Sequence, residues 1–196
     1  SSTIIRALST GRPEAMEIVP TALAGVFELR LDVRADSRGR FKRHYCEKTF
    51  AKAGLMTRVV QVNHSITLGR GSLRGLHFQR PPHMEDKLVS CTFGRVFDVA
   101  VDLRRGSPTY LRWTGVELDE STAFHIPKGC AHGFQALSEE AHLVYLHSEY
   151  YAAEAEGGVR YDDPAIGIDW PLEPTNLSER DRAFAPILEE FESLTV

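Results

Sequence analysis

An all-β protein, built as a sandwich or barrel with a few short helices, is the fold class that the sequence predicts. Short runs of β-forming residues follow one another at intervals of roughly 8–12 residues, with turn signals between them. Apolar and polar residues alternate most clearly over Arg95–Arg104, as on a half-buried strand. The motifs GxGxxG and GxxxxGK[ST] do not occur, so neither a Rossmann nor a P-loop nucleotide site is supported.

The elements expected in order are mostly strands, with two helices. Residues 1–17 are expected to form an arm, and residues 18–196 a single domain, which is long enough to bury a core. Turns are expected at Asp36–Gly39 and Gly106–Thr109, and Pro81-Pro82 should end a strand because proline gives no N–H to a ladder. The expected strands are Gly25–Val33, Phe41–Cys46, Arg58–Thr67, Ser72–Phe78, Lys87–Thr92, Arg95–Arg104, Leu111–Leu118, Ala123–Ile126, His132–Leu137 and Ala141–Tyr151, and the expected helices are Glu47–Gly54 and about Ser178–Phe191.

Composition excludes several classes of partner. The net charge is −4, from 23 basic and 27 acidic residues, so nothing in the charge favours binding to nucleic acid or to an anionic membrane. No apolar run approaches the roughly 20 residues of a membrane span, and the first residues lack the pattern of a signal peptide. The three cysteines are far apart in the sequence and odd in number, which predicts buried thiols in a reducing cytoplasm.

Gly71–Val89, GSLRGLHFQRPPHMEDKLV, concentrates chemically useful side chains in one short stretch. Arg74 and His77 lie on one expected strand, where alternation points them to opposite faces unless a bulge intervenes. Lys87 opens the next strand. A histidine and a lysine on neighbouring strands can converge on one small molecule.

A second histidine lies in the turn Pro127–His132, whose PxGxxH pattern in a jelly roll indicates the cupin group, many members of which bind a metal. A metal-binding cupin needs an HxH pair and a carboxylate on the earlier strand. Here that position is His77-Phe78-Gln79, in which glutamine replaces the second histidine, and Glu85 is the only nearby acid. Glutamine is a poor ligand for a transition metal, so the sequence favours a site without metal.

Without a metal, we expect the cavity of the jelly roll to hold His77, Lys87, His132 and Tyr145. A histidine, with an ordinary pKa of about 6.5, can remove a proton next to a carbonyl at neutral pH. A lysine ammonium can stabilise the enolate oxygen that forms, and a tyrosine can return a proton from the opposite face. Removal on one face and return on the other inverts the carbon, so the expected product is an epimer.

These residues stand within a larger set of ordered motifs, through which the sequence resembles the dTDP-4-dehydrorhamnose 3,5-epimerase family from about Ile18 to Pro186. The motifs are DSRGRF (Asp36–Phe41), QVNHS (Gln61–Ser65), LRGLHFQRPP (Leu73–Pro82), KLV (Lys87–Val89), FDVAVDLRRGSPTY (Phe97–Tyr110), IPKGCAHGF (Ile126–Phe134), YDDPAIGIDWP (Tyr161–Pro171) and LSERD (Leu177–Asp181).

The resemblance implies a cupin-type double-stranded β-helix (jelly roll) that uses neither metal nor other cofactor and forms a homodimer. The implied substrate is a nucleoside-diphosphate 4-keto-6-deoxy sugar, whose C4 ketone acidifies the protons at C3 and C5. By motif, His77 would be the base, Asp181 the carboxylate that orients it, Lys87 the partner of the ketone oxygen and Tyr145 the acid. His132 would line the pocket near the sugar.

For the nucleotide, the resemblance implies Arg38 and Arg74 near the diphosphate, because guanidinium groups match phosphate geometry. It also implies contacts to the nucleotide or sugar from five further residues, with Tyr151 stacking on the base. These residues are Gln61, Asn63, Tyr151, Glu156 and Arg180.

One position departs from the family pattern. The family often has RGxFxE after the turn, whereas this chain has RGRFKR, with Arg43 in place of the acid that helps to hold the nucleoside. The nucleotide base therefore stays open, as does the choice between C3, C5 or both. A metal-dependent cupin enzyme and a non-catalytic nucleotide-sugar binding cupin remain as alternatives.

Overall fold

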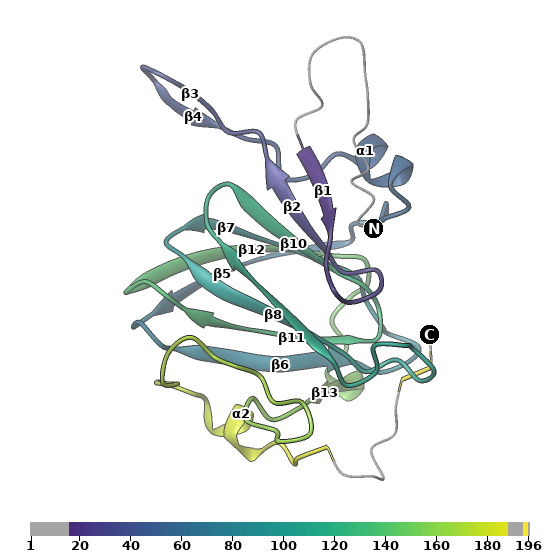
Figure 1. Cartoon of the computed structure of the whole chain (residues 1–196). Coiled ribbons are helices and arrows are strands. Elements are labelled where there is room, and N and C mark those ends of the chain that lie inside the picture. Colours follow the sequence, from purple (N-terminus) through teal and green to yellow (C-terminus); the bar gives the residue numbers. More distant parts are fainter. Residues whose placement is uncertain (1–15, 188–193, 196) are drawn as a thin grey trace.

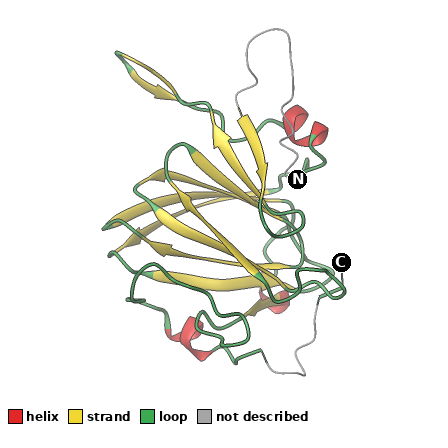
Figure 2. Ribbon diagram, viewed as in Figure 1, coloured by secondary structure: helices red, strands yellow, loops and turns green. Residues whose placement is uncertain are grey.

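Two antiparallel β-sheets face each other in the computed structural model, which describes residues 16–187 and 194–195 (Figures 1 and 2). The larger sheet has the strand order β1-β2-β10-β7-β12-β5, and the smaller has the order β13-β6-β11-β8-β9. All the named strand pairs are antiparallel. The predicted all-β class is therefore confirmed over the described residues.

The bounds of most elements follow the predicted runs closely, but Met16–Pro20 and Glu156–Gly158 were not predicted as strands, and the first of them includes the last two residues of the expected arm. The strands are β1 Met16–Pro20, β2 Phe27–Leu31, β3 Arg34–Asp36, β4 Gly39–Phe41, β5 Gln61–Leu68, β6 Leu73–Gln79, β7 Lys87–Phe93, β8 Val96–Asp102, β9 Trp113–Leu118, β10 Thr122–Ile126, β11 Cys130–Ala136, β12 Glu140–His147 and β13 Glu156–Gly158. The helices are α1 Glu47–Lys52, a 3-10 turn at Ala153–Ala155, and α2 Glu179–Ala183.

The core fills the space between the sheets, and alternation along each strand decides which side chains enter it. On β8, Ala100 packs into this inner core, while Val99 and Val101 pack on the outer face of the smaller sheet. Asp98 and Asp102 share the inner face with Ala100, and both are fully buried. Alternation alone leaves open whether these two aspartates face water or a polar interior, and their burial shows a polar interior.

Strand β6 contains the bulge on which the direction of its polar side chains depends. His77 lies opposite His132 of β11, but Arg74 lies opposite Phe134, so β6 has one extra residue between the two pairs. The extra residue reverses the alternation. Arg74 and His77, which strict alternation would separate, therefore line the same cavity.

Three predicted elements differ from the structure. The chain is not in a strand over residues 42–46, and β12 ends at His147, so Tyr151 lies in a loop. The C-terminal helix ends at Ala183 because Pro186 follows closely, and a proline disfavours helix in the residue before it. The remainder of the predicted helix, residues 188–193, and most of the predicted arm, residues 1–15, lie outside the described residues.

Two features lie outside the sandwich. Helix α1 covers the outer face of the larger sheet, where Phe50 packs with Leu88 and Leu146. The β3–β4 hairpin projects away from both sheets (Figure 1). None of the helices in the described part of the chain is long and apolar enough to cross a membrane. Cys46, Cys91 and Cys130 are free thiols, and the predicted cytoplasmic location stays a prediction.

Candidate active site

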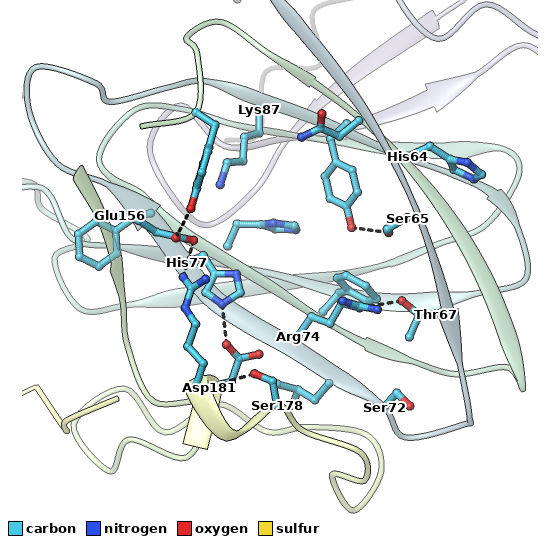
Figure 3. Close-up of a pocket in the computed structure, with 18 of the residues that line it drawn as sticks. His64, Ser65, Thr67, Ser72, Arg74, His77, Lys87, Glu156, Ser178 and Asp181 are labelled. Atoms are coloured by element: carbon cyan, nitrogen blue, oxygen red, sulfur yellow. Dashed lines mark hydrogen bonds and ion pairs between the residues drawn. The ribbon is translucent and has the colours of Figure 1, made fainter. Parts of the chain in front are cut away.

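A cavity of about 850 Å³ lies between the two sheets and is lined from β5, β6, β7, β11, β12 and the segment that carries α2 (Figure 3). All but one of the predicted site residues line it, and Arg38 is the exception. The lining residues among those predicted are Gln61, Asn63, Arg74, His77, Lys87, His132, Tyr145, Tyr151, Glu156, Arg180 and Asp181.

His77 on β6 and Asp181 on α2 lie far apart in the sequence but form a hydrogen-bonded pair. The imidazole Nε2 of His77 donates to Asp181 Oδ1 at 2.7 Å, and Asp181 Oδ2 accepts the backbone N–H of Gly75 at 3.2 Å (Figure 3). Ser178 caps α2 by accepting the N–H of Asp181 at 3.0 Å, which fixes the carboxylate under the imidazole. His77 keeps 32% of its side chain exposed to the cavity, whereas Asp181 is 6% exposed.

The electrostatics of Asp181 suit a residue that supports a base. Burial alone would raise the pKa of Asp181, but the hydrogen bond and charge of His77, with the backbone N–H of Gly75 and the hydroxyl of Ser178, hold that pKa below its ordinary value. The carboxylate is therefore ionised at neutral pH. An ionised carboxylate can only accept, so it holds the proton of His77 on Nε2 and leaves Nδ1 as the nitrogen able to take a proton from a substrate.

A second imidazole–carboxylate pair lies deeper in the cavity and has a different character. His132 Nε2 lies 2.6 Å from Asp98 Oδ1, and the side chains are 7% and 0% exposed. Burial raises the pKa of Asp98 in spite of the opposing charge and hydrogen bond of His132. The other oxygen of Asp98 has no hydrogen-bond partner among the described residues. This pair is thus held almost dry behind the exposed imidazole of His77.

The larger sheet supplies the opposite wall of the cavity. Tyr145 on β12 meets Ser65 of β5, with 3.1 Å between the hydroxyl oxygens, and its ring lies against the ring of His132. Burial raises the pKa of Tyr145, so the hydroxyl keeps its proton at neutral pH. Lys87, the first residue of β7, extends into the cavity from the side across from His77 (Figure 3). An imidazole on one wall thus faces an ammonium and a phenol on the other.

One end of the cavity is rich in groups that bind sugars and phosphates. Tyr151 donates its hydroxyl proton to Glu156 at 2.8 Å, and Arg180 pairs with the other oxygen of the same carboxylate. Gln61 accepts the backbone N–H of Tyr151 at 3.2 Å, which ties this loop to the edge strand β5. At another point of the wall, Arg74 donates to the hydroxyl of Thr67 at 3.0 Å.

Arg38 is not brought to the cavity of its own chain. It lies at the turn of the β3–β4 hairpin, 87% exposed, and its guanidinium pairs with Asp36 at 2.6 Å. Arg43, the departure from the family pattern, is exposed just beyond the same hairpin. Arg38 lies outside the cavity because the hairpin leads away from the sandwich, a direction that local sequence does not specify (Figure 1).

Gln79 has a structural role that the sequence did not reveal. Its amide nitrogen donates to the carbonyls of His83 and Tyr150, and its oxygen accepts the N–H of Ala152 at 2.7 Å. The side chain therefore fastens two loops to β6, and its oxygen is already engaged. The described residues contain no group of three or more His, Cys, Asp and Glu side chains arranged to hold a metal ion.

Several lining residues were not predicted from the sequence, and three of them are ionisable, namely His64, Glu85 and His147. The sequence suggested Glu85 only as a metal ligand and gave His64 and His147 no role in a site. His147 stands two residues after Tyr145 on β12, and alternation puts both side chains on the same face of the strand. Glu85 stands two residues before Lys87, in the loop that leads into β7. That spacing was the available signal.

Comparisons with known proteins agree with this geometry. The family model described as dTDP-4-dehydrorhamnose 3,5-epimerase matches residues 20–189. A dTDP-4-dehydrorhamnose 3,5-epimerase of Methanothermobacter thermautotrophicus is 46% identical over 176 residues, covering 87% of this chain and 94% of the relative. A dTDP-4-dehydrorhamnose 3-epimerase of Streptomyces niveus is 44% identical over 170 residues, covering 85% of this chain and 82% of the relative.

A solved structure is similar over almost the whole chain. It is a dTDP-6-deoxy-D-glucose-3,5-epimerase of Legionella pneumophila Philadelphia 1 in complex with dTDP-4-keto-L-rhamnose, with a TM-score of 0.86 and 39% identity over 92% of this chain and 98% of that one. The predicted cupin jelly roll is confirmed by such neighbours. The chain belongs to the dTDP-4-dehydrorhamnose 3,5-epimerase family, whose named members are isomerases that act on carbohydrates.

Proposed function

We propose that this protein inverts C3, C5 or both in a nucleoside-diphosphate 4-keto-6-deoxy sugar, without a metal ion. The observation that carries the proposal is the placement of the His77–Asp181 pair, 2.7 Å apart, across one cavity from Lys87 and Tyr145. The family relationship supports the reaction class, since its members are named for this epimerisation.

The reaction proceeds through an enolate. Nδ1 of His77 takes the proton from the carbon next to the C4 ketone, and the electrons of the broken C–H bond form a C=C bond and leave the negative charge on the ketone oxygen. The ammonium of Lys87 stabilises that oxygen. Tyr145 returns a proton to the carbon from the opposite face, the C=O bond re-forms, and the centre is inverted. Asp181 stabilises the imidazolium of His77. The imidazolium then releases its proton to solvent and the tyrosinate of Tyr145 takes one up, which restores both groups.

The test is conversion of such a substrate by the wild-type protein and by His77→Ala, followed by NMR of the sugar product. We expect an epimer from the wild type and loss of at least about 10²-fold in rate for the variant, with unchanged circular dichroism. NMR also shows whether C3, C5 or both are inverted. Full activity of His77→Ala would remove His77 as the base.

For the nucleotide we propose the end of the cavity formed by Gln61, Tyr151 and Arg180. At this end Tyr151 offers an aromatic face and Arg180 offers a guanidinium group, and Arg74 offers a second guanidinium group for the diphosphate from another point of the wall. Asn63, Glu156 and His132 complete the proposed contacts to sugar and nucleoside. A thermal-shift series with dTDP, UDP, CDP and GDP tests this, and the base preferred is the one whose diphosphate raises Tm most. No shift with any of them would refute a nucleotide site.

We further propose a homodimer, in which Arg38 acts in the cavity of the second copy. Four large apolar residues of the larger sheet are each at least half exposed, namely Val62, Ile66 and Leu68 on the edge strand β5 and Phe93 at the end of β7. Such a face commonly marks an interface. The hairpin tip also exposes an apolar side chain, 68% of Phe41, beyond the sandwich. A second copy would cover both.

Mixing of two inactive variants tests this arrangement. If Arg38 acts across the dimer, co-expressed His77→Ala and Arg38→Ala chains form a heterodimer with one complete site, and activity returns. If Arg38 acts within its own chain, every site of the heterodimer lacks one residue and activity stays absent. Sedimentation of the wild type gives the oligomeric state independently, and a monomer would refute the proposal.

A further inference from the structure

Three ionisable side chains form a compact network at the wall of the cavity that faces His77. One oxygen of Glu85 lies 3.1 Å from Lys87 Nζ, and the other lies 2.7 Å from His147 Nδ1. None of the three side chains is more than 12% exposed. Both oxygens of a single buried carboxylate are therefore used, one by an ammonium and one by an imidazole.

The sheet register brings these groups together. Lys87 of β7 lies directly opposite His147 of β12, and residues opposite each other in an antiparallel pair share a face. Glu85 precedes Lys87 by two residues, in the loop that leads into β7. Backbone pairing thus places two of the three groups, and Glu85 reaches both of them from the adjoining loop.

The charges in the network balance each other. Burial alone would raise the pKa of Glu85, but the hydrogen bond from His147 and the charge of Lys87 hold that pKa below its ordinary value. Glu85 is therefore ionised and can only accept, so Nδ1 of His147 carries the proton. The other ring nitrogen of His147 lies 3.4 Å from the amide nitrogen of Asn63, which can donate to it.

The other ionisable groups near Lys87 are poorer counter-ions. Asp98 of β8 is close enough for the charge of Lys87 to influence it, but it is already shared with His132, and burial raises its pKa. Tyr145 keeps its proton. Glu85 is thus the carboxylate that compensates the ammonium, and a buried ammonium without such a partner is strongly disfavoured.

We propose that Glu85 and His147 are positioning residues that keep Lys87 charged and aimed at the ketone oxygen of the substrate. Glu85 restrains the ammonium, and His147 occupies the second oxygen so that the carboxylate cannot turn away. Neither residue touches the reacting atoms. The inference rests on the proposed function, because the role of Lys87 belongs to it.

The test compares Glu85→Gln with the wild type in kcat, KM and the pH dependence of kcat. The glutamine keeps the shape but removes the charge, and the ammonium is displaced and loses its proton at lower pH. We expect kcat to fall on the order of 10²-fold with little change in KM. The alkaline limb of the profile should move to lower pH.

Glu140→Gln is the matched control, because Glu140 also pairs with a histidine at 2.7 Å, His142, but outside the cavity. It should leave kcat and the profile unchanged. His147→Gln provides a second variant should Glu85→Gln fail to fold. It should lower kcat by a smaller factor, since Glu85 keeps the ammonium but loses its other donor.

The double variant Glu85→Gln/Lys87→Met decides whether Glu85 acts through the lysine. We expect it to be no slower than Lys87→Met alone, since coupled residues are not additive. A lower Tm with an unmoved alkaline limb, or additive losses in the double variant, would reduce the network to a structural role and overturn the inference. If Lys87→Met keeps full activity, the proposed role of Lys87 fails instead, and the two failures are thus distinguished.

Discussion

Replacement of Asp181 by asparagine tests the link between geometry and catalysis most sharply, because it keeps the shape of the side chain. The carboxylate meets two donors, the Nε2–H of His77 at 2.7 Å and the N–H of Gly75 at 3.2 Å. An asparagine has only one oxygen to meet them. The structure therefore determines which way the amide turns, and that choice sets the tautomer of the base.

The size of the effect follows from these contacts. An amide nitrogen turned to Gly75 would oppose its N–H, at a cost of about 1–3 kcal/mol for buried unsatisfied donors. The nitrogen therefore turns to His77, whose Nε2 must accept and whose Nδ1 takes the proton. This tautomer is favoured by about 5- to 150-fold, at roughly 1.4 kcal/mol per factor of ten. With the lost support of the imidazolium, about 1.5–3 kcal/mol, kcat should fall about 10²- to 10⁴-fold.

The assay is steady-state epimerisation followed by NMR, with KM and Tm measured on the same preparations. KM should change little, because Asp181 acts through His77 and not on the substrate. Asp162→Asn is the matched control, since Asp162 pairs with Arg160 at 2.8 Å on the surface. A kcat for Asp181→Asn within tenfold of the wild type, with the fold intact, would refute the tautomer argument.

Three further predictions concern stability and the acid. Asp102→Asn should lower the free energy of unfolding, measured in urea at pH 7, by about 2 kcal/mol without affecting kcat. Burial alone would raise the pKa of Asp102, but Arg104 and two hydroxyl groups hold it at about 2. Because the pKa of Asp102 is lower in the folded than in the unfolded protein, its carboxylate stabilises the fold at higher pH. The difference in unfolding free energy between wild type and variant should therefore shrink as the pH falls from about 4 toward 2, and an undiminished difference would contradict this. Gly133→Ala places a Cβ 2.7 Å from the carbonyl oxygen of Arg74, at the β6 bulge. It should destabilise the fold by about 1–3 kcal/mol and lower Tm and kcat together. An unchanged Tm would show that the bulge adapts. Ser65→Ala removes the hydroxyl that lowers the pKa of Tyr145, so kcat should fall about 2- to 10-fold at constant KM, and a change in KM alone would count against Tyr145 as the acid.

Much of the fold was predictable because local patterns decide it. Period-two alternation located β8 and its two faces, and Pro81-Pro82 marked the end of β6. Ordered motifs also identified which residues would gather in one cavity, although they lie far apart in the sequence. Asp181 was assigned to His77 on the motif alone, and the structure brings the two side chains to 2.7 Å.

The remaining features depend on tertiary geometry. The bulge in β6 is an extra residue relative to its partner strand, so the sequence of β6 alone could only leave it open. The direction of the β3–β4 hairpin is also set by tertiary geometry, and it places Arg38 outside the cavity of its own chain. Taken singly, Glu85 and His147 have the sequence context of ordinary surface residues. Their contact depends on the register of β7 against β12.

The central claim is that a proton is removed to His77 and returned by a different group on the opposite wall. A single turnover in D₂O measures this directly, with the position of deuterium read by NMR. The account predicts one solvent deuterium at each inverted carbon in the wild type, and none in His77→Ala. Inversion with full retention of the original hydrogen would contradict the account.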